Sequence, residues 1–301
     1  MSAATLRIGS RASALARTQT EWLAERLGDP IAFVWIRSEG DRDTVRPLAE
    51  MGGVGVFTAA LHHALREDRC DAAVHSLKDL PVENDPGIVL AAVPVREDPR
   101  DAWLSRDATP FSKLKSGAVV ATGSPRRDAQ LRRLRPDLSI VGLRGNVDTR
   151  LRKLREGAFD GMVLAMAGLN RLGLASAVTH PFEPEEMLPA PGQGALAITI
   201  REGDAASERR VLAVTDVRTA AAVAAERAAL HGLRAGCHAP VGALAHVEGG
   251  RISLRVRLIA PDGSEALESV VEGGITEAVA LGHRAADDLL ARGGGRWLTS
   301  P

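Results

Sequence analysis

Short apolar runs of strand length alternate with helical segments through most of the chain. In the first part, strands are predicted at Thr5–Ile8, Ile31–Ile36 and Ala72–His75, with helices ending near Leu27 and covering Thr58–Glu67. Strands that alternate with helices in this way indicate a parallel or mixed α/β sheet. The order of these elements therefore constrains the fold more than any single motif does.

The alternating pattern restarts near Asp98 and changes again near Val217. The middle part is predicted to contain a second set of strands and helices: Val119–Ala121, Ser124–Leu134, Ser139–Leu143, Asp148–Glu156 and Met162–Ala165. The last part begins with an alanine-rich helix and continues with strands at Val241–Val247, Ile252–Ala260 and Ala266–Val271. We therefore expect three domains.

Composition excludes several classes of protein. The 301 residues include 38 Lys+Arg and 38 Asp+Glu, so there is no basic excess of the kind that a general nucleic-acid coat needs. Aromatic residues make up 3% with no tyrosine, which argues against stacking platforms for single strands. Two cysteines exclude a disulfide framework, and the eight histidines show no metal-ligand spacing. No apolar run reaches transmembrane length and no secretory signal is visible, so we expect a cytoplasmic protein without membrane partners.

Arginines stand at three junctions where a predicted strand ends and a helix begins. They are Arg11 after Gly9-Ser10, Arg126 and Arg127 after Ser124-Pro125, and Arg144 with Arg150 around Gly145-Asn146. A cation at a helix N-terminus opposes the helix dipole, whereas an anion bound there is favoured by the dipole and by the free N–H groups. The pattern indicates sites for a carboxylate or phosphate, and solvated surface arginines remain the alternative.

Two further segments carry residues that could take part in a chemical reaction. Lys78 and Asp79 follow a short strand, where a carboxylate beside cations can stay ionised or move a proton; an exposed chance ion pair is the alternative. Cys237 lies in a loop beside Arg234 and His238, which favour a thiolate, although a free cysteine is commonly a small buried hydrophobe. We interpret Cys70 as structural.

These segments, taken in order, resemble the porphobilinogen deaminases, also called hydroxymethylbilane synthases. The resemblance runs through nearly the whole chain, in Leu6-Arg-Ile-Gly-Ser-Arg-Ala-Ser, Ala73-Val-His-Ser-Leu-Lys-Asp-Leu-Pro, Arg96-Glu-Asp-Pro-Arg-Asp-Ala, Thr122-Gly-Ser-Pro-Arg-Arg, Leu143-Arg-Gly-Asn-Val-Asp-Thr-Arg-Leu, Ala167-Gly-Leu-Asn-Arg-Leu-Gly-Leu, Leu188-Pro-Ala-Pro-Gly-Gln-Gly-Ala and Gly236-Cys-His-Ala-Pro.

The resemblance implies a fold of three α/β domains. The first two would resemble the two lobes of periplasmic binding proteins, and the third would be a small sheet with helices that carries the cofactor cysteine. The implied boundaries are residues 1–95 with 193–213, residues 98–190, and residues 217–301.

The resemblance also implies an activity. The enzyme would join four porphobilinogen units head to tail, with loss of ammonia, to give hydroxymethylbilane for tetrapyrrole and haem biosynthesis. The growing chain would hang from a dipyrromethane cofactor attached to Cys237 through a thioether. Each step would pass through an electrophilic azafulvene, and we expect a monomer that uses no metal and binds no nucleic acid.

Residue roles follow from the same resemblance. Asp79 would be the catalytic residue, facing the pyrrole N–H groups. The cofactor would be held by Lys78, Asp79, Ser124, Arg126, Arg127, Arg144 and Arg150 besides Cys237, and the substrate by Arg11, Ser13, Arg144, Arg150 and Arg171. The chain departs from the family pattern at Val54, Gly123 and Thr199, where a lysine, a serine and a glutamate are frequent.

Two other classes of function remain in view. A non-catalytic binding protein or effector domain on the same two-lobed fold would explain the arginines, but it would not explain Cys237, Asp79 or the third domain. A nucleic-acid binder is a weaker alternative, because the net charge is zero.

Overall fold

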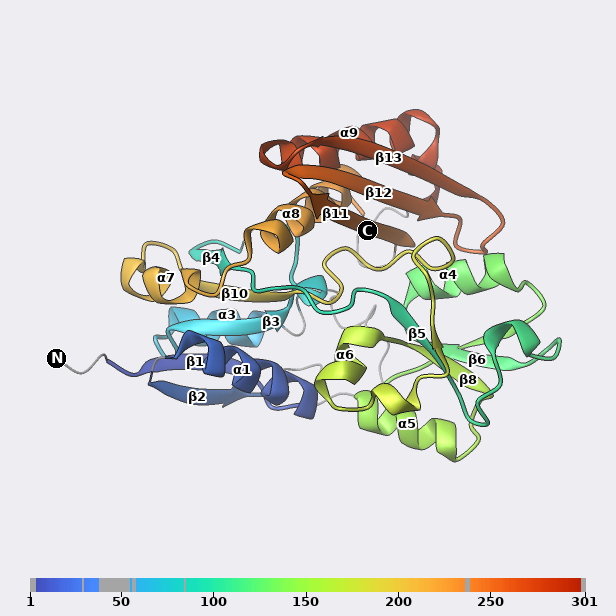
Figure 1. Ribbon diagram of the computed structural model, residues 1–301, viewed down its shortest axis with the longest axis horizontal. Helices are drawn as coiled ribbons and strands as arrows, with labels where there is room; N and C mark the ends of the chain where they lie inside the picture. Colours follow the sequence, from blue (N-terminus) through green and yellow to red (C-terminus); the bar gives the residue numbers. More distant parts are fainter. Residues whose placement is uncertain are drawn as a thin grey trace. The chain divides into compact units, whose positions relative to one another are not determined.

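A computed structural model describes residues 4–28, 30–37, 55, 58–83, 85–235 and 239–298, and its described elements form three β-sheets (Figure 1). The chain divides into two compact units. One comprises residues 1–97 and 195–220, and the other comprises residues 98–194 and 221–301.

The first unit contains a five-stranded mixed sheet of order β2-β1-β3-β10-β4. Its elements are β1 (Leu6–Arg11), α1 (Ala14–Leu27), β2 (Ile31–Ile36), α3 (Ala59–Arg66), β3 (Ala72–Ser76), β4 (Ile88–Ala92), β10 (Leu196–Arg201) and α7 (Ala205–Leu212). β1 runs parallel to β2 and β3, whereas β10 is antiparallel to both of its neighbours. A late segment of the chain is thus inserted between two early strands.

Helices cover both faces of this sheet, and local signals fix where they begin and end. Leu23 of α1 packs with Ile8 and Val74 on one face, while α3 packs Leu61 against Ala73 on the other. Ser13 caps the start of α1 by accepting a hydrogen bond from the amide of Ala16. The predicted helix therefore begins next to Arg11, at the end of β1.

The second unit contains another five-stranded mixed sheet, of order β7-β6-β8-β5-β9. Its elements are β5 (Asp101–Ser105), β6 (Val119–Thr122), α4 (Pro125–Leu134), β7 (Ser139–Gly142), α5 (Val147–Arg155), β8 (Gly161–Ala165), α6 (Met166–Arg171) and β9 (His180–Pro181). The sequence pattern did not predict β5, which is short and begins with a charged residue. That residue, Asp101, is fully buried and proves central to the site described below.

The same unit carries a third sheet, an antiparallel meander of β11 (Val241–Glu248), β12 (Arg251–Ile259) and β13 (Ala266–Gly274). One cluster of buried residues joins this sheet to α8 (Val217–Gly232) and α9 (Ala278–Ala291). In Figure 1, α9 covers one face of the meander. The predicted small sheet with helices is confirmed, and each of its strands ends within a few residues of the predicted position.

Two negative expectations can be compared with the described residues. In the ranges given above, no helix is both long and apolar enough to cross a membrane. Within the same ranges, no group of three His, Cys, Asp or Glu side chains is placed to hold a metal ion.

Candidate functional site

In the first unit, candidate residues gather at one edge of the sheet. Parallel strands place their carboxyl ends at the same edge, so Arg11 at the end of β1 lies on the side where β3 ends. A single 3-10 turn, Leu77–Asp79, follows β3 directly and carries the exposed Lys78 and the half-buried Asp79. Ser13, the cap of α1, belongs to the same edge.

The end of β3 is held from one face of the sheet by a side-chain hydrogen bond. Gln19 of α1 donates from Nε2 to Ser76 Oγ at 3.2 Å. The hydrogen-bond ladder between β3 and β10 continues for one more bond beyond the end of β3, because the amide of Leu77 donates to the carbonyl of Ala195 at 3.0 Å. The turn that presents Lys78 and Asp79 is therefore anchored at its first residue.

In the second unit, Ser124 is the N-cap residue of α4. Ser124 accepts a hydrogen bond from the amide of Arg127, and Pro125 occupies the first helical position. Arg126 and Arg127 occupy the first turn, as expected, but both are buried, with exposed fractions of 4% and 6%. The alternative that these two are solvated surface arginines is therefore wrong.

Both buried arginines share one carboxylate. Asp101 lies 2.7 Å from a guanidinium nitrogen of Arg126 through one oxygen and 2.7 Å from one of Arg127 through the other. Burial alone would raise the pKa of Asp101, but the charges of the two arginines, with hydrogen bonds from Arg126 and Gln193, hold it at about 2. Two cations thus face one anion in a buried cluster, which leaves an excess positive charge.

The arginine cluster is connected to the segment that returns to the first unit. Gln193 donates from Nε2 to the carbonyl of Pro99 at 2.7 Å and to Asp101 Oδ1 at 3.0 Å. Arg127 also donates to the carbonyl of Val163 at 3.0 Å. Neither Asp101 nor Gln193 was among the predicted site residues, although both lie within segments that carry the family resemblance.

Arg126 is also connected to the third sheet through the carbonyl of Leu188. Arg126 Nη1 donates to that carbonyl at 2.7 Å, and Gln130 Nε2 donates to it at 3.1 Å. Gln130 Oε1 in turn accepts hydrogen bonds from the amide of Leu188 at 2.8 Å and from Arg257 of β12 at 3.1 Å. Helix α4 is therefore joined to β12 by a side-chain hydrogen bond.

The other candidate arginines of the second unit, Arg144, Arg150 and Arg171, are half-buried. Asn146 caps α5 by accepting from the amide of Thr149, and Arg150 donates to the carbonyl of Gly145 at 2.7 Å. Arg144 lies two residues before this cap. Arg171 ends α6 and donates to the carbonyl of Gly194 at 2.8 Å. Both predicted junctions of this unit thus join a strand, a turn and a capped helix.

The predicted cofactor cysteine, Cys237, and the variant position Val54 lie outside the described residues. The other cysteine, Cys70, is fully buried, and burial raises the pKa of its thiol to about 11. A thiol in that state is a poor nucleophile, which agrees with the prediction that Cys70 is structural.

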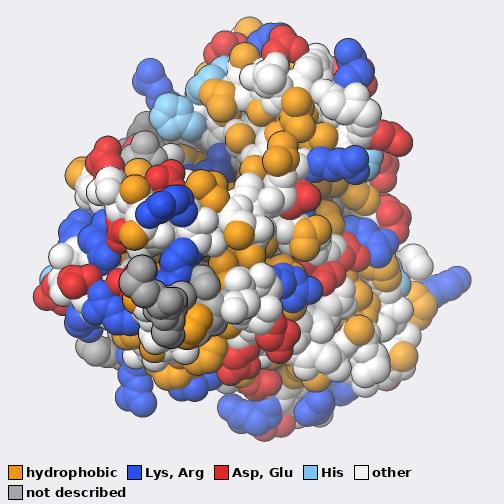
Figure 2. Space-filling model, turned by 60° about the vertical axis from the view of Figure 1, so that its left-hand side comes forward, with side chains coloured by type: hydrophobic (Ala, Val, Ile, Leu, Met, Phe, Trp, Pro, Cys, Tyr) orange, Lys and Arg blue, Asp and Glu red, His pale blue; other side chains and the backbone are white. Residues whose placement is uncertain are grey.

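Charged side chains do not segregate by sign on the face drawn in Figure 2. Lysine and arginine side chains are interspersed with aspartate and glutamate there. This mixture of signs on that face is in keeping with a net charge of zero.

Comparison with known proteins identifies the family. Residues 6–209 match the family model described as "Porphobilinogen deaminase, dipyromethane cofactor binding domain", and residues 220–291 match its C-terminal domain. The chain belongs to the porphobilinogen deaminase family. Among curated relatives, porphobilinogen deaminase of Thermobifida fusca is 47% identical over 97% of this chain and 95% of its own length. That of Thermus thermophilus is 46% identical over 95% of this chain and 96% of its own length.

Family membership decides between the classes of function. Porphobilinogen deaminases are transferases of tetrapyrrole biosynthesis that carry a dipyrromethane cofactor, so the chain is an enzyme and not a binding protein on a similar fold. Solved structures similar to the chain include an arginine-specific periplasmic binding protein of Salmonella typhimurium, with 14% identity and a TM-score of 0.39 over 72% of this chain and 94% of that one.

Proposed function

We propose that this chain joins four porphobilinogen units head to tail, releasing ammonia at each step, with Asp79 as its catalytic residue. The observation that carries the proposal is the buried cluster in which Arg126 and Arg127 share the single carboxylate of Asp101. A buried excess of positive charge is costly unless an anion compensates for it. Pyrroles bearing acetate and propionate groups supply such anions.

The residues fit a cofactor that bears carboxylates. Ser124, Arg126 and Arg127 belong to the start of α4, where the helix dipole favours an anion. Arg144 and Arg150, around the start of α5, would take further carboxylates, and Lys78 with Asp79 would take the pyrrole rings from the first unit. We assign the covalent thioether to Cys237, since the only other cysteine is buried with a raised pKa.

The substrate would be bound through its own carboxylates by Arg11, Ser13, Arg144, Arg150 and Arg171. Guanidinium groups suit this task because they bind carboxylates through two parallel hydrogen bonds. When bound, the cofactor supplies the pyrrole carbon onto which the first unit is added. Asp79 would accept hydrogen bonds from pyrrole N–H groups, stabilise the positive charge that develops there, and assist removal of the proton.

Intact mass of the purified protein tests the cofactor assignment. The wild type should exceed the mass of the bare sequence by two linked pyrrole units. Cys237→Ala should lose this increment, whereas Cys70→Ala should keep it. Active enzyme with the mass of the bare sequence, or loss of the increment in Cys70→Ala only, would contradict the assignment.

Arginine variants test the anion sites. Arg126→Leu and Arg144→Leu should reduce cofactor content or stop elongation at an intermediate length, since a charged hydrogen bond contributes about 1.5–3 kcal/mol. Arg152→Leu is the matched control, because its exposed side chain pairs with Glu156 one turn away. If all three variants load cofactor and elongate like the wild type, the buried cluster binds no ligand.

We infer further that the enzyme works as a monomer in the cytoplasm without nucleic-acid partners. Light scattering of the loaded enzyme at micromolar concentration measures the first property. A mass of twice the chain's 31.8 kDa would overturn it.

A further inference from the structure

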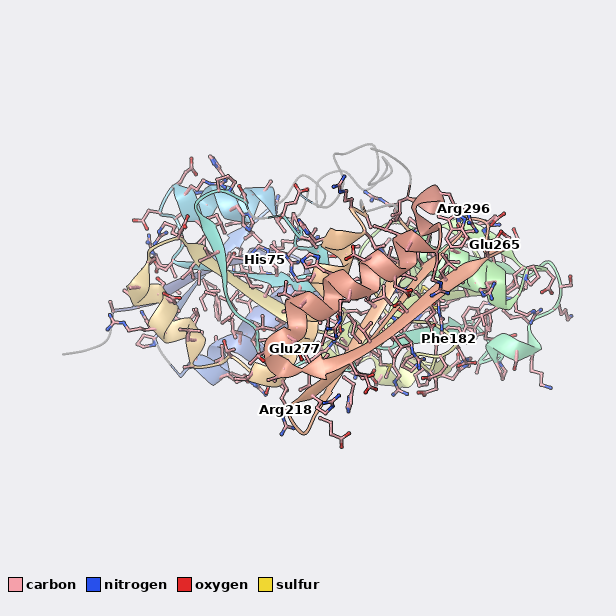
Figure 3. The ribbon with its side chains drawn as sticks, turned by 90° about the horizontal axis from the view of Figure 1, so that it is seen from above. His75, Phe182, Arg218, Glu265, Glu277 and Arg296 are labelled. Atoms are coloured by element: carbon pink, nitrogen blue, oxygen red, sulfur yellow. The ribbon has the colours of Figure 1, made fainter. Side chains whose placement is uncertain are left out.

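A buried polar pair joins the end of β3 to β10. Nε2 of His75 lies 2.9 Å from the hydroxyl oxygen of Thr199, and both side chains are buried. His75, which is labelled in Figure 3, is the penultimate residue of β3, so only Ser76 separates it from the turn that carries Lys78 and Asp79. Nothing in the reaction proposed above uses either residue.

The pair continues into a chain of contacts across the α3 face of the sheet. The ring of His62 meets the ring of His75 edge-on, with centroids 5.4 Å apart and planes at 75°. Nδ1 of His62 in turn lies 2.7 Å from a carboxylate oxygen of Asp85, which also pairs with Arg66. The chain thus connects β10, β3, α3 and the loop before β4.

The direction of the His75–Thr199 bond restrains sliding of the two strands. In the antiparallel ladder, His75 pairs with Ala197 and Thr199 pairs with Ala73, so the side-chain bond runs diagonally across the ladder. A slip of β3 along β10 would break this bond. The other edge of β10 offers less restraint, because its register with β4 shifts between Ile198 and Thr199.

Stability alone does not require a polar pair at this place. Apart from His62, the same face carries a cluster of buried apolar side chains that includes Leu61, Ala73 and Ile88. Replacing both members of a buried hydrogen-bonded pair by apolar groups of similar shape can be close to neutral for stability. A specific geometrical role accounts for the pair better than a contribution to the core does.

We propose that His75 and Thr199 are positioning residues, whose hydrogen bond fixes the end of β3 and thereby the place at which the following turn holds Lys78 and Asp79. The proposal rests on the proposed function, because Asp79 is the catalytic residue there. Gln19 restrains the same strand from the opposite face through Ser76. Loss of the His75–Thr199 bond therefore displaces the turn without detaching it from the sheet.

The test compares Thr199→Val with Thr199→Ser in enzyme that carries its cofactor. Valine keeps the shape and removes the hydroxyl, so kcat should fall by about 10- to 100-fold, the order expected for small displacements of reacting groups. KM should change little, and hydrogen exchange at residues 77–80 should become faster. Serine restores the hydroxyl and should recover most of the lost kcat. Thr179→Val, which removes a comparable bond to the amide of Ser105 in the other unit, should leave kcat unchanged.

Asp79→Asn, measured in parallel, distinguishes failure of the positioning role of His75 and Thr199 from failure of the proposed function. If Asp79→Asn is inactive while Thr199→Val keeps wild-type kcat and exchange rates, the positioning role is wrong and the proposed function stands. If Asp79→Asn keeps full activity, the proposed function fails first. If Thr199→Val does not fold, the kcat of His75→Gln is compared with the kcat of Thr199→Ser instead. A wild-type kcat in His75→Gln overturns the proposal.

Discussion

One oxygen of the Asp101 carboxylate lies 2.7 Å from a guanidinium nitrogen of Arg126, and both side chains are buried. The second oxygen is paired with Arg127 at the same distance. The first turn of α4 can therefore carry two buried cations only because a strand from elsewhere in the sequence places an anion against it. The stability of the second unit should depend strongly on this one carboxylate.

Asp101→Asn should lower the free energy of unfolding by about 3–5 kcal/mol, because it leaves two buried guanidinium groups without a counter-charge. Urea unfolding of the variant measures this loss. Asp128→Asn on α4 breaks a partly exposed pair with Arg132 and should cost less than about 1 kcal/mol. Equal effects of the two substitutions would show that the buried cluster is no more important than a surface pair.

Gln130→Leu should destabilise the contact between α4 and the third sheet. The substitution removes the hydrogen bonds to Leu188 and Arg257 and leaves the buried amide of Leu188 unpaired, which costs about 1–3 kcal/mol. Urea unfolding again provides the measurement. Arg133→Ala, which loses only an exposed bond of 3.4 Å to the carbonyl of Ser264, serves as the control and should stay within about 0.5 kcal/mol of the wild type.

Stability should fall in mild acid because of His75. Burial lowers the pKa of this histidine to about 3 in the folded protein, whereas an unfolded chain titrates near 6.5. As the pH falls from 7 to 5, the unfolded state therefore takes up a proton that the folded state does not, and unfolding becomes easier by about 2 kcal/mol. The carboxylates with lowered pKa, such as Asp85, lose their contribution only at still lower pH.

Urea titrations at pH 7 and pH 5 measure this effect. His75→Gln should reduce the difference between the two pH values, while His246→Gln, which alters an exposed histidine, should leave it unchanged. An undiminished difference in His75→Gln would mean that other groups cause the acid sensitivity.

Local signals explain why so much of the fold was predictable. Ser13, Ser124 and Asn146 each cap a helix through their own side chain. The helices predicted at Ser124–Leu134 and Asp148–Glu156 begin within one residue of the observed starts, Pro125 and Val147. The apolar run Ile31–Ile36 forms a strand with the predicted limits. Each of these features depends on neighbours within one turn or one strand.

The parts that were missed depend on distant neighbours. Asp101 begins a short strand, and its sequence neighbours do not distinguish it from an ordinary loop carboxylate. Its partners, Arg126 and Arg127, lie more than 20 residues further along the chain, so no local pattern reveals them. His75 and Thr199 are separated by 124 residues and meet only because β10 is inserted beside β3. The motif around Lys78 and Asp79 was visible, whereas the bond that holds its strand could not be derived from spacing.

Gly282→Ala should destabilise the packing of α9 against α8 beside the third sheet. A Cβ atom at this position would lie 2.4 Å from the carbonyl oxygen of Ala225 and 2.5 Å from the Cβ of Ala228, so α8 and α9 would have to separate. Overpacking of this kind costs about 1–3 kcal/mol and exceeds the gain in helix propensity. Gly295→Ala is the control, since its nearest neighbour would be 3.7 Å away, and Tm measurements compare the two variants.

Asp79→Asn should fold normally, because the side chain is half-buried at the end of a turn and is not part of the sheet. Its turnover should nevertheless fall by about 10²–10⁴-fold, since an amide can neither accept the proton nor stabilise a positive charge as a carboxylate does. Steady-state kinetics, with intact mass to verify cofactor loading, measure the loss. Asp107→Asn, at an exposed turn of the second unit, is the matched control and should retain wild-type turnover. Turnover of loaded Asp79→Asn close to that of the control would remove Asp79 from the mechanism and leave the arginine sites as binding groups only.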